Sequence, residues 1–88
     1  MYYIYILFSR KDKKLYIGKT NNLKRRVLEH KNGKTKTSKY RLPIELIYYE
    51  AYKIKADADA REEYLKSGGG RKRLKQQLKR LFHQIGYN

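Results

Sequence analysis

Residues 2–18 read YYIYILFSRKDKKLYIG, and this stretch determines the centre of the fold. Its first seven residues are all apolar or aromatic, of types that favour β-strands. Successive side chains of a strand point to opposite faces. One face therefore carries Tyr2, Ile4, Ile6 and Phe8, and the other carries Tyr3, Tyr5 and Leu7. The pattern predicts a strand over 2–8 with two faces that can pack against neighbours.

A second strand is predicted over 15–18, after the short polar connection 9–14. A connection of this length joins antiparallel neighbours. If Phe8 pairs with Leu15, Tyr5 lies opposite Gly18, with Tyr16 two residues from Gly18 along the second strand. The two tyrosines are then diagonal neighbours on one face. A slip of one residue would place them on opposite faces.

The rest of the chain predicts a small sheet flanked by helices, an α+β arrangement within the α/β class. Caps and apolar spacing predict, in order, a helix over Leu23–Lys31, a loop over 34–42, a strand over 45–52, a helix from an Asp57 cap to Lys66, a break at 67–70, and a basic amphipathic helix over about 71–85. The glycines of 68–70 could instead cradle a phosphate. They lack the Gly-Lys-Ser/Thr ending of a nucleotide-binding loop, so the helix break is favoured. One domain fills 1–88.

The charge of the chain points to a polyanionic partner. There are 23 Lys and Arg against 8 Asp and Glu, a net charge of +15 on 88 residues. Such a surface attracts nucleic acid by steering and counterion release. We expect DNA rather than RNA, and anionic membrane or acidic protein are the weaker alternatives.

Other features of the composition predict a soluble, cytoplasmic protein without a membrane partner. The chain has no cysteine, which suits a reducing compartment. Its apolar runs fall short of the roughly 20 residues that span a bilayer, and no signal-peptide pattern precedes the first strand. We expect a monomer or a weak dimer.

Hydrolysis of a phosphodiester needs a base, a cation for the phosphate charge and usually a divalent metal. Without cysteine, and with only two histidines, the chain favours a hard, oxygen-liganded ion, Mg²⁺ with Mn²⁺ as a substitute. Glu62 is the candidate metal ligand because it shares the apolar side of its helix with Ala58 and Leu65, whereas Asp59 and Glu63 are expected to face solvent.

A phosphate clamp is predicted on the helix Leu23–Lys31. Arg26 and His30 stand four residues apart on the face that also carries Leu23 and Val27, which aims both towards the sheet. A tyrosine has an ordinary pKa of about 10, so it acts as a base near neutral pH only with help from neighbouring cations. Lys19 and Arg26 are the candidates for that help. On pattern alone the tyrosines could equally be core and rim residues.

The sequence then shows four features in order: Tyr3-Ile4-Tyr5, Tyr16-Ile17-Gly18, Arg26 with His30, and Arg61-Glu62 in a helix. In this order and spacing they resemble the GIY-YIG nuclease superfamily. The likeness runs from about residue 2 to residue 74 and is greatest to short stand-alone bacterial members; it extends to the nuclease domain of the excinuclease and to homing endonucleases. Tyr3 stands where the family name has glycine.

The resemblance implies a three-stranded antiparallel sheet and a role for each matched residue. Tyr5 matches the general base, Tyr16 the supporting tyrosine, Gly18 the glycine that leaves room for the site, Arg26 the arginine that stabilises phosphate charge, His30 a residue that assists or orients, and Glu62 the single metal-binding glutamate. Further contacts with nucleic acid are expected from Lys19, Lys36, Lys39, Arg41 and Arg71. Tyr48 and Tyr49 are further candidates for lining the path of the strand.

The sequence therefore predicts a Mg²⁺-dependent endonuclease or structure-selective nuclease that hydrolyses DNA phosphodiesters, in repair or recombination. The chief alternative is a non-catalytic nucleic-acid-binding module that keeps the fold. A third hypothesis is a basic scaffold that docks an acidic protein through its last helix.

Overall fold

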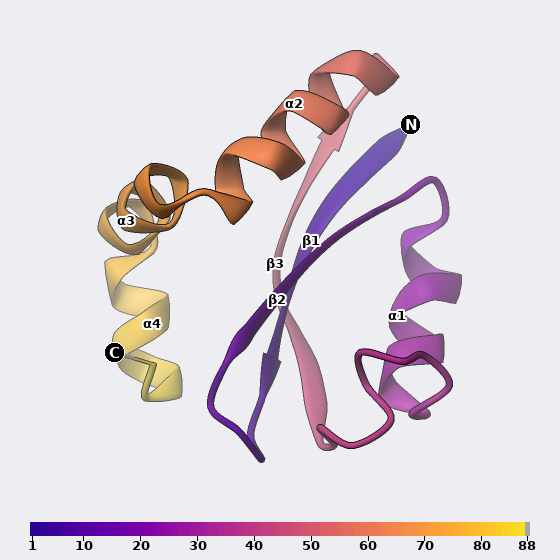
Figure 1. The fold of residues 1–88 in the computed structure, drawn as a ribbon, viewed down its shortest axis with the longest axis vertical. Coiled ribbons are helices and arrows are strands. Elements are labelled where there is room, and N and C mark those ends of the chain that lie inside the picture. Colours follow the sequence, from indigo (N-terminus) through magenta and orange to yellow (C-terminus); the bar gives the residue numbers. More distant parts are fainter. Residues whose placement is uncertain (88) are drawn as a thin grey trace.

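Strands come first in the chain and helices dominate its second half. The computed structural model describes residues 1–87 (Figure 1). Its elements are β1 (Tyr2–Ser9), β2 (Leu15–Thr20), α1 (Leu23–Lys31), β3 (Ile44–Tyr52), α2 (Lys55–Lys66), α3 (Gly68–Gln77) and α4 (Lys79–Ile85). The strands form one antiparallel sheet in the order β2-β1-β3. The predicted α+β class and three-stranded sheet are confirmed.

The register of the first hairpin is the predicted one. Tyr5 pairs with Gly18 and Leu7 pairs with Tyr16, so the two tyrosines lie diagonally on one face. On its other side β1 pairs with β3, with an irregularity between Ile6 and Leu7. β1 is therefore the central strand and β2 is an edge strand, a position that matters for the site.

Both faces of β1 are buried, which explains its unbroken apolar sequence. The face with Ile4, Ile6 and Phe8 packs against α2, α3 and α4, and the face with Tyr5 and Leu7 looks towards α1. Figure 1 shows the sheet nearly edge-on, with α1 on one side and the other three helices opposite. The molecule thus has three layers, and β1 runs through the middle one.

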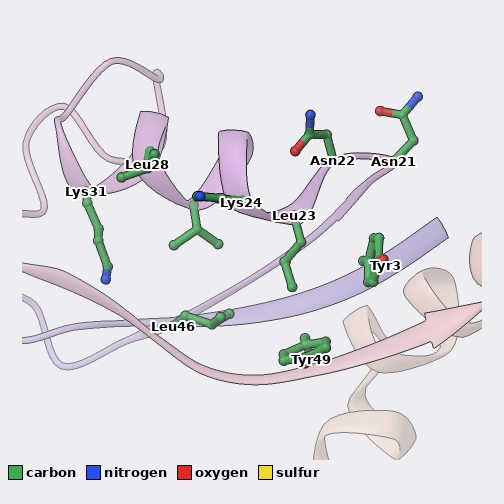
Figure 2. A pocket seen from close by; sticks show the side chains of 10 residues that line it. Tyr3, Asn21, Asn22, Leu23, Lys24, Leu28, Lys31, Leu46 and Tyr49 are labelled. Atoms are coloured by element: carbon green, nitrogen blue, oxygen red, sulfur yellow. The ribbon is translucent and has the colours of Figure 1, made fainter. Parts of the chain in front are cut away.

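α1 covers its side of the sheet incompletely. A hollow of about 570 Å³ lies between α1 and the strands (Figure 2). Leu23, Leu46 and Tyr49 are among its lining side chains. α1 begins where the sequence predicts: the Asn22 side chain accepts a hydrogen bond from the Arg25 amide at 3.1 Å. The inward positions Val27 and His30 are buried.

α2 begins two residues before the predicted cap. Ile54 precedes its first residue, Lys55, and supplies no side-chain hydrogen bond. Asp57 lies in the first turn instead. An acidic residue is favoured both at the cap and in the first turn of a helix, because each position lies near the exposed amides. The sequence signal of Asp57 was correct for a helix start and wrong for its register.

The segment after α2 forms two helices, where a single helix over 71–85 was predicted. The break is confined to Ser67, whose Oγ accepts a hydrogen bond from the Gly70 amide at 3.1 Å and so caps α3. A Cβ at Gly70 would lie 1.8 Å from the Tyr64 carbonyl oxygen, so glycine allows α3 to cross close to α2. A second break at Leu78 separates α3 from α4. Within residues 1–87 every helix is too short or too polar to be a membrane span.

Candidate active site at the edge of the sheet

A cavity of about 220 Å³ opens at the edge strand β2, where the two sides of the sheet meet. α1 contributes Arg26 and His30, and α2 on the opposite side contributes Glu62. The lining includes all five residues predicted to carry catalysis: Tyr5, Tyr16, Arg26, His30 and Glu62. Since β2 is an edge strand of the sheet that residues 1–87 form, side chains from both helices can reach around it.

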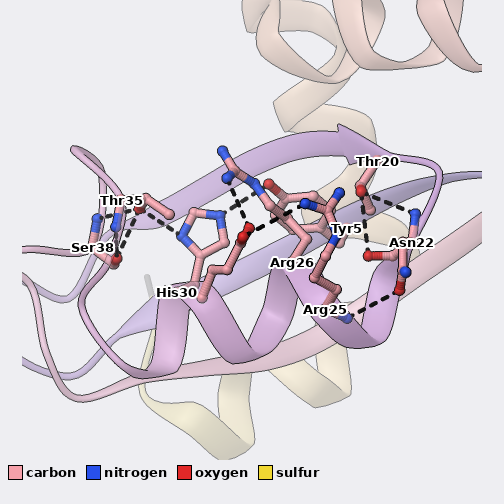
Figure 3. Close-up of polar contacts among 9 residues, drawn as sticks. Tyr5, Thr20, Asn22, Arg25, Arg26, His30, Thr35 and Ser38 are labelled. Atoms are coloured by element: carbon pink, nitrogen blue, oxygen red, sulfur yellow. Dashed lines mark hydrogen bonds and ion pairs between the residues drawn. The ribbon is translucent and has the colours of Figure 1, made fainter.

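Tyr5 and His30 form a buried pair. The Tyr5 Oη lies 3.0 Å from His30 Nε2, and the two residues are 4% and 3% exposed. On its other side, His30 Nδ1 lies 3.1 Å from Thr35 Oγ1, which is 2.8 Å from Ser38 Oγ (Figure 3). A chain of polar atoms therefore runs from the cleft into the loop after α1. Thr35 and Ser38 were missed because nothing in the sequence relates that loop to β1.

The protonation of His30 follows from its surroundings. Burial, and then the positive charge of Arg26, lower the pKa of His30 below its ordinary value. Near neutral pH the imidazole is therefore neutral and carries one N–H. Either Tyr5 donates to Nε2 while Nδ1–H donates to Thr35, or both bonds are reversed. The first arrangement leaves the Tyr5 oxygen free to accept a proton from the cleft.

Arg26 lines the cleft together with Tyr5 and interacts with its hydroxyl. The hydroxyl, and then the Glu29 carboxylate, raise the pKa of Arg26, whose Nη1 donates to Glu29 Oε1 at 3.1 Å. Its side chain is 40% exposed at the cleft. Glu29 occupies only part of the guanidinium, which has five N–H donors. Arg26 can therefore bind a phosphate oxygen.

Tyr16 lines the cleft, but its hydroxyl is bound elsewhere. The hydroxyl donates to Asp12 in the β1–β2 turn. Burial, and then Asp12, raise the pKa of Tyr16 above its ordinary value. The Arg41 guanidinium lies over the Tyr16 ring at 5.1 Å, and its Nε is 3.5 Å from Asp12 Oδ2. Tyr16 is thus held protonated by Asp12, a partner of Tyr16 that sequence reasoning missed.

Glu62 projects from α2 into the cleft. Its side chain is 23% exposed, and its Oε2 accepts a hydrogen bond from Lys66 Nζ, one turn later, at 3.2 Å. Only one carboxylate oxygen takes part in that contact. Asp59 lies at the surface as expected, with a side chain that is 41% exposed, and its carboxylate binds Lys19 of β2 and also Lys55 at 2.8 Å.

The rotation of α2 is fixed by a cluster on β3 that sequence reasoning did not find. Arg61 donates two hydrogen bonds of 2.9 Å to the Glu50 carboxylate, and the hydroxyls of Tyr48 and Tyr52 each donate to Glu50 at 2.7 Å. Burial opposes the charge of Glu50, but Arg61 and the two hydroxyls prevail and lower its pKa. Because Arg61 precedes Glu62 directly, this cluster ties the turn of α2 that carries Glu62 to β3.

Comparison with known proteins agrees with this geometry. Residues 1–80 match the family model described as the GIY-YIG catalytic domain. The chain belongs to the GIY-YIG family. It is 45% identical over 67 residues to a UPF0213 protein of Clostridium perfringens, covering 75% of this chain and 71% of the relative. A UPF0213 protein of Staphylococcus saprophyticus is 37% identical over 75 residues, covering 84% and 90%. No solved structure gives a significant match.

Membership in the GIY-YIG family confirms the predicted resemblance and places the chain in a family of nucleases that bind nucleic acid. The two motifs that give the family its name correspond to Tyr3-Ile4-Tyr5 on β1 and Tyr16-Ile17-Gly18 on β2, and residues of both line the cleft. The residues that follow them in the sequence come to the cleft from both neighbouring layers.

The residues of this GIY-YIG cleft suit a hard metal ion of low protein coordination. Within residues 1–87 there is no group of three or more His, Cys, Asp or Glu side chains that could hold a metal. Among the described residues that line the cleft, Glu62 is the one carboxylate that could hold such an ion. Mg²⁺ is often bound by only one or two carboxylates, with water and substrate phosphate as its other ligands. A single carboxylate beside a bound phosphate fits that description of a Mg²⁺ site.

The basic residues predicted to bind nucleic acid lie in three different places on the surface of this GIY-YIG domain. Lys19 lines the cleft but is paired with Asp59. Lys36 and Lys39 are exposed on the loop after α1 and do not line the cleft. Arg41 and Arg71 line one groove beside it.

Proposed function

We propose that this chain is a divalent-metal-dependent endonuclease that hydrolyses a nucleic-acid phosphodiester in the cleft at β2. The observation that carries the proposal is the meeting of the buried Tyr5–His30 pair with Arg26 and Glu62 in one cavity. These are the three parts that the reaction needs: a route for a proton, a cation for the phosphate, and a carboxylate for a metal.

Tyr5 is proposed as the base. As water attacks phosphorus, its proton passes to the Tyr5 oxygen, and the Tyr5 proton passes to His30 Nε2. Neutral His30 can accept that proton, and Thr35 Oγ1 then accepts the Nδ1–H of the imidazolium. Tyr5 never has to exist as a free phenolate. Tyr16 suits this role less well, because Asp12 already accepts its proton and its pKa is raised.

Arg26 and Glu62 are proposed to act on the phosphate. The exposed part of the Arg26 guanidinium donates to a non-bridging oxygen and stabilises the charge that develops there. Glu62 holds the metal, which when bound supplies further charge neutralisation. A phosphorus–oxygen bond to water forms, the bond to the leaving oxygen breaks, and that oxygen takes a proton from solvent.

Cleavage of end-labelled oligonucleotides tests the proposal. Purified protein is incubated with single-stranded, duplex and branched DNA and RNA, with Mg²⁺ or Mn²⁺ and with chelator, and binding is recorded in parallel. We expect metal-dependent cutting with DNA as the preferred substrate. We expect Glu62→Gln and Arg26→Ala to lose this cutting. The matched controls are Glu63→Gln and Arg25→Ala, the adjacent residues outside the cleft lining. Binding without cutting on every substrate would overturn the proposal in favour of a non-catalytic module.

A further inference from the structure

A hollow of about 750 Å³, distinct from the hollow beside α1, adjoins the cleft at the same edge of the sheet. This hollow and the cleft share Tyr16, Ile17 and Lys66 in their linings. The hollow then continues to Arg71 at the start of α3 and to Tyr87 near the end of the chain. We refer to it as the β2 groove. A continuous surface therefore leads out of the cleft, across β2, to the last helices.

The β2 groove is lined by positive charge. Four cations lie along it, Lys14, Arg41, Lys66 and Arg71, and among residues 1–87 its lining includes no Asp or Glu. Lys66 and Arg41 have carboxylate partners in Glu62 and Asp12. Lys14 and Arg71 are exposed, and the structure of residues 1–87 gives neither an ion pair. Both can neutralise phosphate groups and release counterions.

Aromatic rings stand along the same groove. Tyr16 lies at the cleft end, with the Arg41 guanidinium over its ring. Tyr87 lies on the groove beyond it, with Lys75 Nζ 5.2 Å from its ring centroid. Phe82 and Phe8 pack edge-on against Tyr87 at 5.2 and 6.4 Å, which holds that ring in place. Single-stranded nucleic acid stacks its bases on aromatic rings and places its phosphates against nearby cations.

The hollow beside α1 offers no comparable route. It is walled largely by apolar side chains and aromatic rings, and its lining shares no residue with the cleft (Figure 2). Charge and continuity both favour the β2 groove.

We propose that the β2 groove binds the nucleic-acid strand that flanks the scissile phosphate, with Lys14 and Arg71 on its phosphates and Tyr87 against a base. That the bound strand flanks a scissile phosphate rests on the proposed function. The binding surface itself is tested without any cleavage.

Fluorescence anisotropy with a labelled oligonucleotide, over a range of salt concentrations, measures the proposed contacts. The Lys14→Gln/Arg71→Gln variant should bind more weakly, and the slope of log Kd against log salt should fall by about 1.4–1.8, because each lost phosphate contact removes about 0.7–0.9. The matched control is Lys24→Gln/Lys31→Gln, which removes the same charge from the hollow beside α1. Its slope should stay near that of the wild type.

A stacking contact is tested by Tyr87→Leu, which should weaken binding roughly tenfold. Its control is Tyr40→Leu, an exposed tyrosine outside the groove. Equal losses in the two double variants, or no loss in Tyr87→Leu, would overturn the assignment of the groove.

Hydrolysis of bis(4-nitrophenyl) phosphate by the wild-type protein tests the proposed function separately, since this diester is too small to need the groove. If it is not hydrolysed and no oligonucleotide is cut, the nuclease proposal fails, and the anisotropy comparison still decides the groove. If hydrolysis occurs while the two double variants bind alike, only the groove proposal fails.

Discussion

Replacing Gly18 with alanine tests the arrangement of the cleft at its tightest point. The added Cβ would lie 2.3 Å from the Tyr5 Oη and 2.4 Å from its Cζ. Non-bonded carbon atoms prefer a separation of about 3.5–4.0 Å. The tyrosine tip must therefore move by about 1 Å or more, because the strand backbone that carries the new methyl group is paired with β1.

The cost of this movement follows from the burial of Tyr5. The residue is 4% exposed and packs in a cluster with Leu7 and Ile44. Overpacking of this kind costs about 1–3 kcal/mol, and loss of the hydrogen bond to His30 adds about 1 kcal/mol. Alanine in a strand recovers about 0.5–1 kcal/mol. The net loss of about 1–3 kcal/mol corresponds to a Tm lower by about 5–15 °C.

Thermal unfolding and cleavage rate measure the two consequences. A misplacement of about 1 Å at a reacting group slows catalysis by about 100-fold. Gly69→Ala is the control, because nothing lies within 4 Å of the Cβ it would add. In a Tyr5→Phe background, Gly18→Ala should cost little further rate, since both changes remove the same proton acceptor. A Gly18→Ala variant with wild-type Tm and rate would show that the cleft is not packed in this way.

Three further predictions concern the side chains around the cleft. The free energy of unfolding should fall as pH drops below about 6.5, because the pKa of His30 is lowered in the folded state and the unfolded chain then binds more protons. Denaturant titrations at several pH values should show this dependence in the wild type and in the control His83→Gln. The dependence should be lost in His30→Gln. Arg61→Met leaves the Glu50 charge unpaired and should cost about 3 kcal/mol in urea unfolding, whereas Arg10→Met, from the exposed pair with Glu45, should cost less than about 1 kcal/mol. Thr35→Val removes the partner of His30 Nδ1 and should slow single-turnover cleavage about tenfold, and Thr35→Ser should restore it.

The part of the fold set by local periodicity could be predicted from the sequence. The alternation in β1 and the short connection to β2 predict the hairpin, and the pairing of Phe8 with Leu15 places Tyr5 opposite Gly18. Helical spacing likewise predicts that Arg26 and His30 share a face and that Glu62 points inward. These relations involve residues near one another in the chain, or strands joined by a short turn.

The contacts that tune the site could not be predicted in this way. Arg61 meets Glu50 across a strand and a helix, and His30 meets Thr35 through a loop without periodicity. Which polar groups pair in such cases depends on how the layers pack. The glycines 68–70 were predicted to lie in a helix break, but they form the first turn of α3. Gly70 is required because α3 crosses close to α2 there, and this contact between helices also depends on packing.

A comparison of Tyr5→Phe with Tyr16→Phe in single-turnover cleavage decides whether Tyr5 is the base. Both variants remove one hydroxyl from the lining of the same cleft. Tyr5→Phe should slow cleavage by about 100- to 10,000-fold, as expected for loss of a general base, while Tyr16→Phe should keep most of the wild-type rate. Near-wild-type cleavage by Tyr5→Phe, together with an inactive Tyr16→Phe, would contradict that assignment.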